Sequence, residues 1–272
     1  MPSILVDQDL CTRCGICSVI CTMGVIDPAD ENTIPKVNKE KAGFCINCGH
    51  CEAYCPSQAL LLNDRPEEKV RIPASAGVID PGDMALYLKK RRSVRHFIKD
   101  PVPREKILAV LEIARYAASG CNSQPVEWIV VYDKEKVKKI ARLTIDWMKT
   151  LLNSDHPMSA FVPNLIAAWE SGSDVICRGA PHLLVATIPE SNPAATVDAI
   201  IALTHVDIAA PAYGIGTCWA GFVAAAAASH APLQEELGIP AGQKSAYVMM
   251  FGNPQYRIHG IPRRKPLCVR WQ

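Results

Sequence analysis

The chain has 272 residues, nearly half of them apolar, so it is long enough to form two domains with separate cores. Its net charge of +2 is too small to indicate nucleic acid or an anionic membrane as a partner. The first ten residues, MPSILVDQDL, lack the cationic start and apolar stretch of a signal peptide, so we expect a cytoplasmic protein whose cysteines bind metal rather than form disulfides.

Two cysteine runs of the form C-x2-C-x2-C-x3-C dominate the first 62 residues. In two-cluster ferredoxins, the first three thiols of one run and the fourth thiol of the other bind each cuboidal cluster. Zinc, which takes four ligands in tetrahedral sets, and a disulfide knot are the weaker alternatives. We therefore predict two [4Fe–4S] clusters, one on Cys11, Cys14, Cys17 and Cys55, the other on Cys45, Cys48, Cys51 and Cys21.

Short apolar segments flank the cysteine runs, at residues 4–6 and 59–62. They are predicted to be strands that close a ferredoxin-like domain over residues 1–62. Residues 63–83 are polar, rich in Pro and Gly and without a clear period, which indicates a linker.

Residues 84–272 are predicted to form a second domain of class α+β, with a central sheet covered by helices. One predicted helix starts at Met84, and three others span residues 104–119, 133–152 and 194–213. The predicted strands are 128–132, 182–187 and 247–251. The inward positions of two helices are expected to be Ile107, Val110, Leu111, Ala114 and Ala117, and Val137, Ile140, Ala141, Ile145 and Met148.

Residues 208–229 contain no charged side chain and are long enough to cross a bilayer. They are mostly Ala and Gly, and Pro211, Gly214 and Gly216 interrupt them. We therefore predict a buried helix, a glycine turn and a second element instead of a membrane span.

Four segments of this domain could carry chemistry. Arg91-Arg92-Ser93-Val94-Arg95 could grip a phosphate, because guanidinium groups match its oxygens. The others are the polar turn from Ser119 to Pro125, the glycine pair in Gly214-Ile215-Gly216 and the basic Arg263-Arg264-Lys265. Taken singly, each is more often a solvated face or an ordinary turn, and position 219 is Trp, so no GxGxxG dinucleotide motif is present.

Taken in order, these four segments resemble the nitroreductase family of FMN enzymes, and the whole chain resembles a ferredoxin-fused nitroreductase. The resemblance implies homodimers with two flavins at the interface and a turn that lines the flavin, often from the partner subunit. It implies that Gly214, Ile215 and Gly216 place a backbone amide near flavin N5, and that Arg263 and Lys265 lie at the phosphate. The FMN contacts that it implies are Arg91, Arg92, Ser93, Arg95, Ser119, Asn122, Gln124, Gly214, Ile215, Gly216, Arg263 and Lys265.

The two halves together indicate an oxidoreductase. Clusters pass single electrons, whereas a flavin stores two and can deliver a hydride. We expect an external donor, such as ferredoxin, flavodoxin or NAD(P)H, to feed the clusters, and FMN to reduce a nitro, quinone, enone or halogenated substrate. An electron relay to a partner protein and a flavin-remodelling or storage protein remain alternatives. His96, His205 and His230 are candidate proton donors, and residues 147–178 form either a lid or ordinary helix packing.

Overall fold

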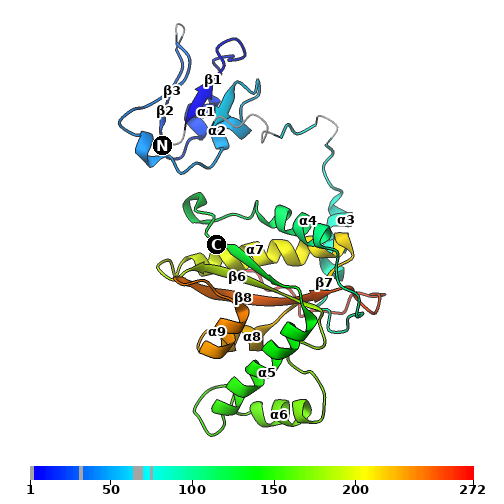
Figure 1. Ribbon diagram of the computed structural model, residues 1–272. Coiled ribbons are helices and arrows are strands. Elements are labelled where there is room, and N and C mark those ends of the chain that lie inside the picture. The colour runs from blue at the N-terminus through cyan, green and yellow to red at the C-terminus, as the bar shows by residue number, and fades with distance from the viewer. Residues whose placement is uncertain (1–2, 31–32, 64–69, 74–75) are drawn as a thin grey trace. The chain divides into compact units, whose positions relative to one another are not determined.

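The computed structural model describes residues 3–30, 33–63, 70–73 and 76–272 (Figure 1). The chain forms two compact units, one of residues 1–78 and 120–123, the other of residues 79–119 and 124–272. Within the predicted linker, residues 64–69 and 74–75 lie outside the described residues. Helix α3, Pro81–Lys90, begins inside the predicted linker and before the predicted Met84, because the Asp80 carboxylate accepts hydrogen bonds from Gly82 N and Asp83 N. The predicted domain boundaries stay predictions.

The first unit is built around two short helices that each follow a cysteine pair. The helices are α1, Ile16–Ile20, and α2, His50–Ala53, and their N-caps are Gly15 and Gly49. Both glycines have left-handed backbones, with φ of 75° and 73°, which glycine adopts without steric cost. Strands β1, Ile4–Val6, and β4, Leu60–Leu62, lie at the two predicted strand positions and pair antiparallel with each other. Strand β2, Ile26–Asp27, pairs with β3, Lys36–Val37.

The second unit contains a four-stranded antiparallel sheet in the order β5-β6-β8-β7. The strands are β5, Glu127–Val131, β6, His182–Pro189, β8, Gln243–Gly252, and β7, Gly216–Trp219. Three of them match predicted strands, whereas β7 was not predicted, because its sequence continues the charge-free Ala- and Gly-rich run.

Helices cover both faces of this sheet (Figure 1). Helices α4, Arg104–Ala114, and α7, Ala195–Ala209, pack on one face. The other face carries α5, Lys134–Thr150, α6, Val162–Glu170, α8, Gly221–Ala227, and α9, Ala231–Leu237. The predicted α+β class, with a helix-covered sheet, is confirmed.

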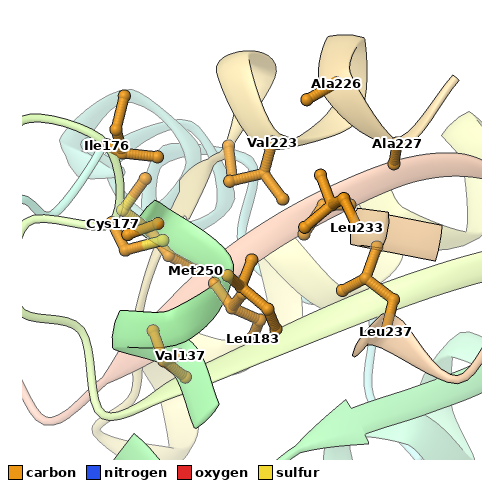
Figure 2. Packing of buried hydrophobic residues seen from close by; sticks show 14 of the residues in the cluster. Val137, Ile176, Cys177, Leu183, Val223, Ala226, Ala227, Leu233, Leu237 and Met250 are labelled. Atoms are coloured by element: carbon orange, nitrogen blue, oxygen red, sulfur yellow. The ribbon is translucent and has the colours of Figure 1, made fainter. Parts of the chain in front are cut away.

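The central strands alternate between the two cores, as a strand buried on both faces must. On β6, Leu183 packs with α5, α8 and α9, whereas its neighbour Leu184 packs with α4 and α7. Figure 2 shows the first core, where Leu183 and Met250 from the sheet meet Val223, Leu233 and Leu237 from the helices.

The predicted inward positions of α5 are all buried, and Asp133 caps that helix. Helix α4 ends at Ala114 and not at residue 119 as predicted, because Arg115 and Tyr116 form a turn. Of its predicted inward positions, Ile107, Val110 and Ala114 are buried, whereas Leu111 and Ala117 are only partly buried. Residues 208–229 form the end of α7, a 3-10 turn at Ala210–Tyr213, a glycine turn, β7 and α8, which agrees with the predicted interruption.

Among the described residues, one helical stretch, Ala195–Tyr213, is apolar and long enough to cross a membrane by length and composition alone. Half of its most apolar window is buried in the second unit, where it forms part of the core.

Candidate functional site

The eight cysteines of the two runs form two separate groups in the first unit. Each group surrounds its own cavity and draws three thiols from one run and one from the other. The first cavity is lined by Cys11, Cys14, Cys17 and Cys55, and the second by Cys21, Cys45, Cys48 and Cys51. This is the crosswise division that the spacing predicts. Within the described ranges, no three His, Cys, Asp or Glu side chains are grouped so that they could hold a single metal ion.

The surroundings of these thiols are apolar on the inner side. Cys17 and Cys51 are buried against Val25 and Leu60. Burial raises the pKa of Cys17, and it raises the pKa of Cys51 to about 11 despite a hydrogen bond from the backbone of Glu52. A buried thiolate is therefore unfavourable unless a cation neutralises it, which is what iron in a cluster provides. The donor set fits the predicted clusters.

Cys55 differs from these two thiols. Burial would raise its pKa, but a hydrogen bond with the Ser57 hydroxyl, together with backbone amides, lowers it below its usual value. Hydrogen bonds to a ligand sulfur also tune the potential of an iron–sulfur cluster.

The arginine-rich segment 91–95 lies beside strand β7 in the second unit. Val94 N donates a hydrogen bond to Thr217 O over 2.8 Å. A Cβ on Gly216 would lie 2.6 Å from Val94 Cγ2, so the segment approaches β7 as closely as it does only because residue 216 has no side chain. The backbone of the predicted phosphate-binding segment is thus held in place by a strand.

Asp207 on α7 joins this segment to β7. Its carboxylate is buried, forms an ion pair with Arg91 Nη1 at 3.2 Å and accepts a hydrogen bond from Trp219 Nε1, also at 3.2 Å. The Thr217 hydroxyl donates to the other carboxylate oxygen. Sequence reasoning missed Asp207, although a buried acid on a largely apolar helix is a usable signal.

Arg95 lines a cavity of about 440 Å3 in the second unit, which we call the arginine cavity. A second arginine, Arg178, lines the same cavity, whose apolar wall includes Met158, Phe222 and Met250. The end of β7 and the start of α8 also border it, through Cys218, Trp219, Ala220 and Gly221. Apolar walls with a few polar groups are typical of sites for flat organic ligands, so the cavity fits part of a flavin or its substrate.

The predicted flavin-lining turn lies elsewhere. Ser119 and Gln124 border a different cavity of about 410 Å3, together with Trp128, Asp198 and residues of α4. Ser119 Oγ accepts a hydrogen bond from Gln124 N, which holds the turn. Asn122 belongs to the first unit, where its amide donates to Asn47 O at 2.8 Å and to Ile46 O at 3.3 Å. One chain therefore does not bring Ser119 and Gln124 together with Arg95 in one cavity.

The other predicted contacts are also separated from the arginine cavity. Gly216 packs against Val94 and Pro254, and Ile215 is buried in the core beside α4 and α7. The end of β7, and not Gly214–Gly216, borders the cavity. Arg263 and Lys265 are exposed in the C-terminal segment.

The candidate proton donors and the candidate lid have mixed placements. The three candidate histidines are not among the cavity's lining residues: His96, His205 and His230. In the candidate lid, Trp147 and Met148 are buried in the core, whereas Met158 lines the arginine cavity. The segment thus combines core packing with one wall of the cavity.

Both units resemble known protein families. The model of the nitroreductase family matches residues 88–253. The chain belongs to the nitroreductase family. The model of a 4Fe-4S dicluster domain matches residues 10–60, and an uncharacterized ferredoxin of Methanocaldococcus jannaschii is 35% identical over 68 residues, which are 24% of this chain and 86% of that ferredoxin. The predicted combination of a ferredoxin domain with a nitroreductase domain is confirmed.

Two further comparisons concern the nitroreductase unit. An iodotyrosine deiodinase of Thermotoga neapolitana is 27% identical over 130 residues, 47% of this chain and 68% of the deiodinase. The crystal structure of a nitroreductase with bound FMN from Desulfitobacterium hafniense has a TM-score of 0.57 at 22% identity and covers 71% of this chain and all of that one. Membership of the family supports the predicted class of enzyme, an FMN-dependent oxidoreductase.

Proposed function

We propose that the protein is an iron–sulfur flavin oxidoreductase. Electrons from an external donor, such as ferredoxin, flavodoxin or NAD(P)H, pass through two [4Fe–4S] clusters to FMN, which reduces a small organic substrate. The observation that carries the proposal is the crosswise grouping of eight thiols around two cavities in a chain of the nitroreductase family. When bound, the clusters would transfer one electron at a time, and FMN would hold two and deliver them as a hydride.

The first unit would hold the clusters and exclude water from them. Cys11, Cys14, Cys17 and Cys55 would hold one, and Cys21, Cys45, Cys48 and Cys51 the other. The buried Val25, Ile26 and Leu60 surround the inner thiols, which keeps the local dielectric low and favours compact thiolate–iron charge pairs.

The second unit would bind FMN through Arg91, Arg92, Ser93 and Arg95 at the phosphate and ribityl chain, with Arg263 and Lys265 as further cations. The position of Arg91 supports this proposal, because Asp207 orients its guanidinium group and leaves the side chain 29% exposed. The nitroreductase of Desulfitobacterium hafniense, whose fold this unit shares, holds bound FMN in its crystal structure.

A homodimer would complete the flavin site. In one chain, Ser119 and Gln124 border one cavity and Arg95 another, so the predicted turn, Asn122 included, would reach the flavin from the partner subunit. The C-terminal segment exposes large apolar side chains, with Leu267 and Trp271 about nine-tenths exposed, which suits a segment that a second copy covers.

Nitro, quinone, enone and halogenated compounds are the proposed acceptors. The similarity to an iodotyrosine deiodinase supports the halogenated class. The arginine cavity supports a small-molecule acceptor over a relay to a protein, because it is open and of ligand size. We also propose a cytoplasmic location, because eight of the twelve cysteines are the proposed cluster ligands and thiols stay reduced in the cytosol.

Anaerobic reoxidation tests the electron path. The protein is reduced with dithionite, mixed with 4-nitrobenzamide, and followed at flavin and cluster wavelengths, with iron and labile sulfide measured in parallel. Cys48→Ala should lose about half of the iron, keep its flavin and lose donor-driven turnover, because one cluster lacks a ligand. The exposed Cys268 gives the matched control, Cys268→Ala, which should keep its iron.

Two results would refute the proposal. One is wild-type protein purified without iron, labile sulfide and flavin. The other is Cys48→Ala with full iron content and unchanged electron transfer from the donor to the acceptor.

A further inference from the structure

The arginine cavity contains a cation that the proposed FMN contacts do not use. Arg178 lies on the loop between α6 and β6, far in sequence from segment 91–95, and it lines the cavity together with Arg95. Its neighbours along the wall include Met158, Val175 and Phe222, so a cationic residue lies in a mostly apolar wall.

The loop that carries Arg178 has a defined backbone. Asp174 Oδ1 accepts hydrogen bonds from Cys177 N at 2.8 Å and Ile176 N at 3.1 Å, and Asp174 Oδ2 accepts one from Gly179 N at 2.8 Å. Arg178 has a φ of +56°, which is uncommon for a residue other than Gly, Asn or Asp and persists only where the surroundings impose it. Ile176 and Cys177, fully buried on the inner side, anchor the turn.

The charges in the cavity are unbalanced. Within the described part of the chain, neither Arg95 nor Arg178 forms an ion pair, and no Asp or Glu lines the cavity. The nearest acid in the loop, Asp174, uses both oxygens on backbone amides. Two guanidinium groups beside apolar walls favour a planar ligand that carries a negative charge, because charge-assisted hydrogen bonds to carboxylates are strong and often bidentate.

We propose that Arg178 binds the acid group of the organic acceptor, so that the enzyme prefers acceptors bearing a carboxylate over neutral ones of equal shape. This inference rests on the proposed function, which assigns Arg95 to the flavin and leaves Arg178 for the substrate. Arg178 is then a specificity-determining residue, contributed by the candidate lid segment, residues 147–178.

Matched probes test the proposal. Binding of benzoate and of benzamide to the purified protein is measured by isothermal titration calorimetry, and kcat/KM is compared for 4-nitrobenzoate and 4-nitrobenzamide. We expect the wild type to bind benzoate about tenfold more tightly, the size of one partly solvent-exposed charge-assisted hydrogen bond. Arg178→Asn should abolish this preference, because it removes the charge and Asn tolerates the left-handed backbone.

Two further variants complete the design. Arg178→Lys should keep part of the preference, since it keeps the charge without the fork. Arg142, exposed on α5, gives the matched control, and Arg142→Gln should keep the full preference.

The inference is overturned if the wild type does not distinguish benzoate from benzamide, or if Arg178→Asn retains the preference. It is also overturned if Arg178→Asn weakens FMN binding, because Arg178 would then belong to the cofactor site. Calorimetry measures benzoate binding directly and needs no turnover. A failure of the proposed function, which would appear as purified protein without clusters or flavin, is therefore distinguishable from a failure of this inference.

Discussion

Replacing Asp207 with asparagine should destabilise the second unit. The substitution keeps the size of the side chain and removes its charge. Asp207 is buried, and its carboxylate is shared by Arg91, Thr217 and Trp219, so three elements lose a common partner: the segment after α3, the strand β7 and helix α7 itself.

The magnitude follows from the burial of the two charges. Removing one member of a buried ion pair costs about 3–5 kcal/mol. Arg91 keeps 29% of its side chain exposed, so water can solvate part of its charge, and asparagine can still accept one hydrogen bond. We therefore expect a loss of about 2 kcal/mol in the free energy of unfolding, which for a domain of 150–250 residues lowers Tm by about 4–8 °C.

Tryptophan fluorescence isolates the affected unit, because all five tryptophans lie between residues 128 and 271. Urea unfolding of Asp207→Asn is compared with that of Asp146→Asn, which alters an exposed acid on α5 and should cost under about 0.5 kcal/mol. A double mutant with Arg91→Gln should cost less than the two single changes together. A loss below about 0.5 kcal/mol for Asp207→Asn, or strict additivity with Arg91→Gln, would refute the reasoning.

Three other outcomes follow from the structure. Burial lowers the pKa of His182, whose Nε2 accepts a hydrogen bond from the backbone amide of Val102, so the folded state binds fewer protons than the unfolded state. The contribution of His182 to stability should therefore be complete above about pH 6.5 and fall as the pH drops below it. The calorimetric Tm should fall less between pH 7.5 and pH 5.5 in His182→Gln than in the wild type. Gly216→Ala should cost about 1–3 kcal/mol in urea unfolding through contact with Val94, and Val94→Ala should recover part of that loss, which no recovery would contradict. Arg91→Ala should weaken FMN binding about tenfold in a fluorescence titration while Arg142→Gln does not, and equal affinities would exclude the phosphate contact.

Local patterns were sufficient where a function depends on residues close together in sequence. The spacing of each cysteine run places three thiols around one turn, and Gly15 and Gly49 allow that turn, so the grouping of the thiols around two cavities could be predicted from spacing and the two-cluster rule. The period of 3.6 over α5 identified its buried face for the same reason, because a helix repeats its contacts locally.

Two features of the second unit, strand β7 and the end of helix α4, could not be predicted from the local sequence. Strand β7 has only four residues and lies on the edge of the sheet, paired with β8 alone, so its conformation depends on a partner far along the chain. Helix α4 ends earlier than predicted, because the pattern of apolar residues continues to Ala117 whereas the chain turns at Arg115 and Tyr116.

The sequence by itself determined the two kinds of domain, the thiols of the candidate clusters and the arginine segment, because each depends on residues that lie close together in the sequence. Only the tertiary structure decided which groups share a cavity. It paired Arg91 with Asp207, placed Arg95 and Arg178 in the wall of one cavity, and placed Ser119 and Gln124 in the wall of another. Those neighbours are set by how strands and helices pack over long separations, which no local pattern of residues encodes.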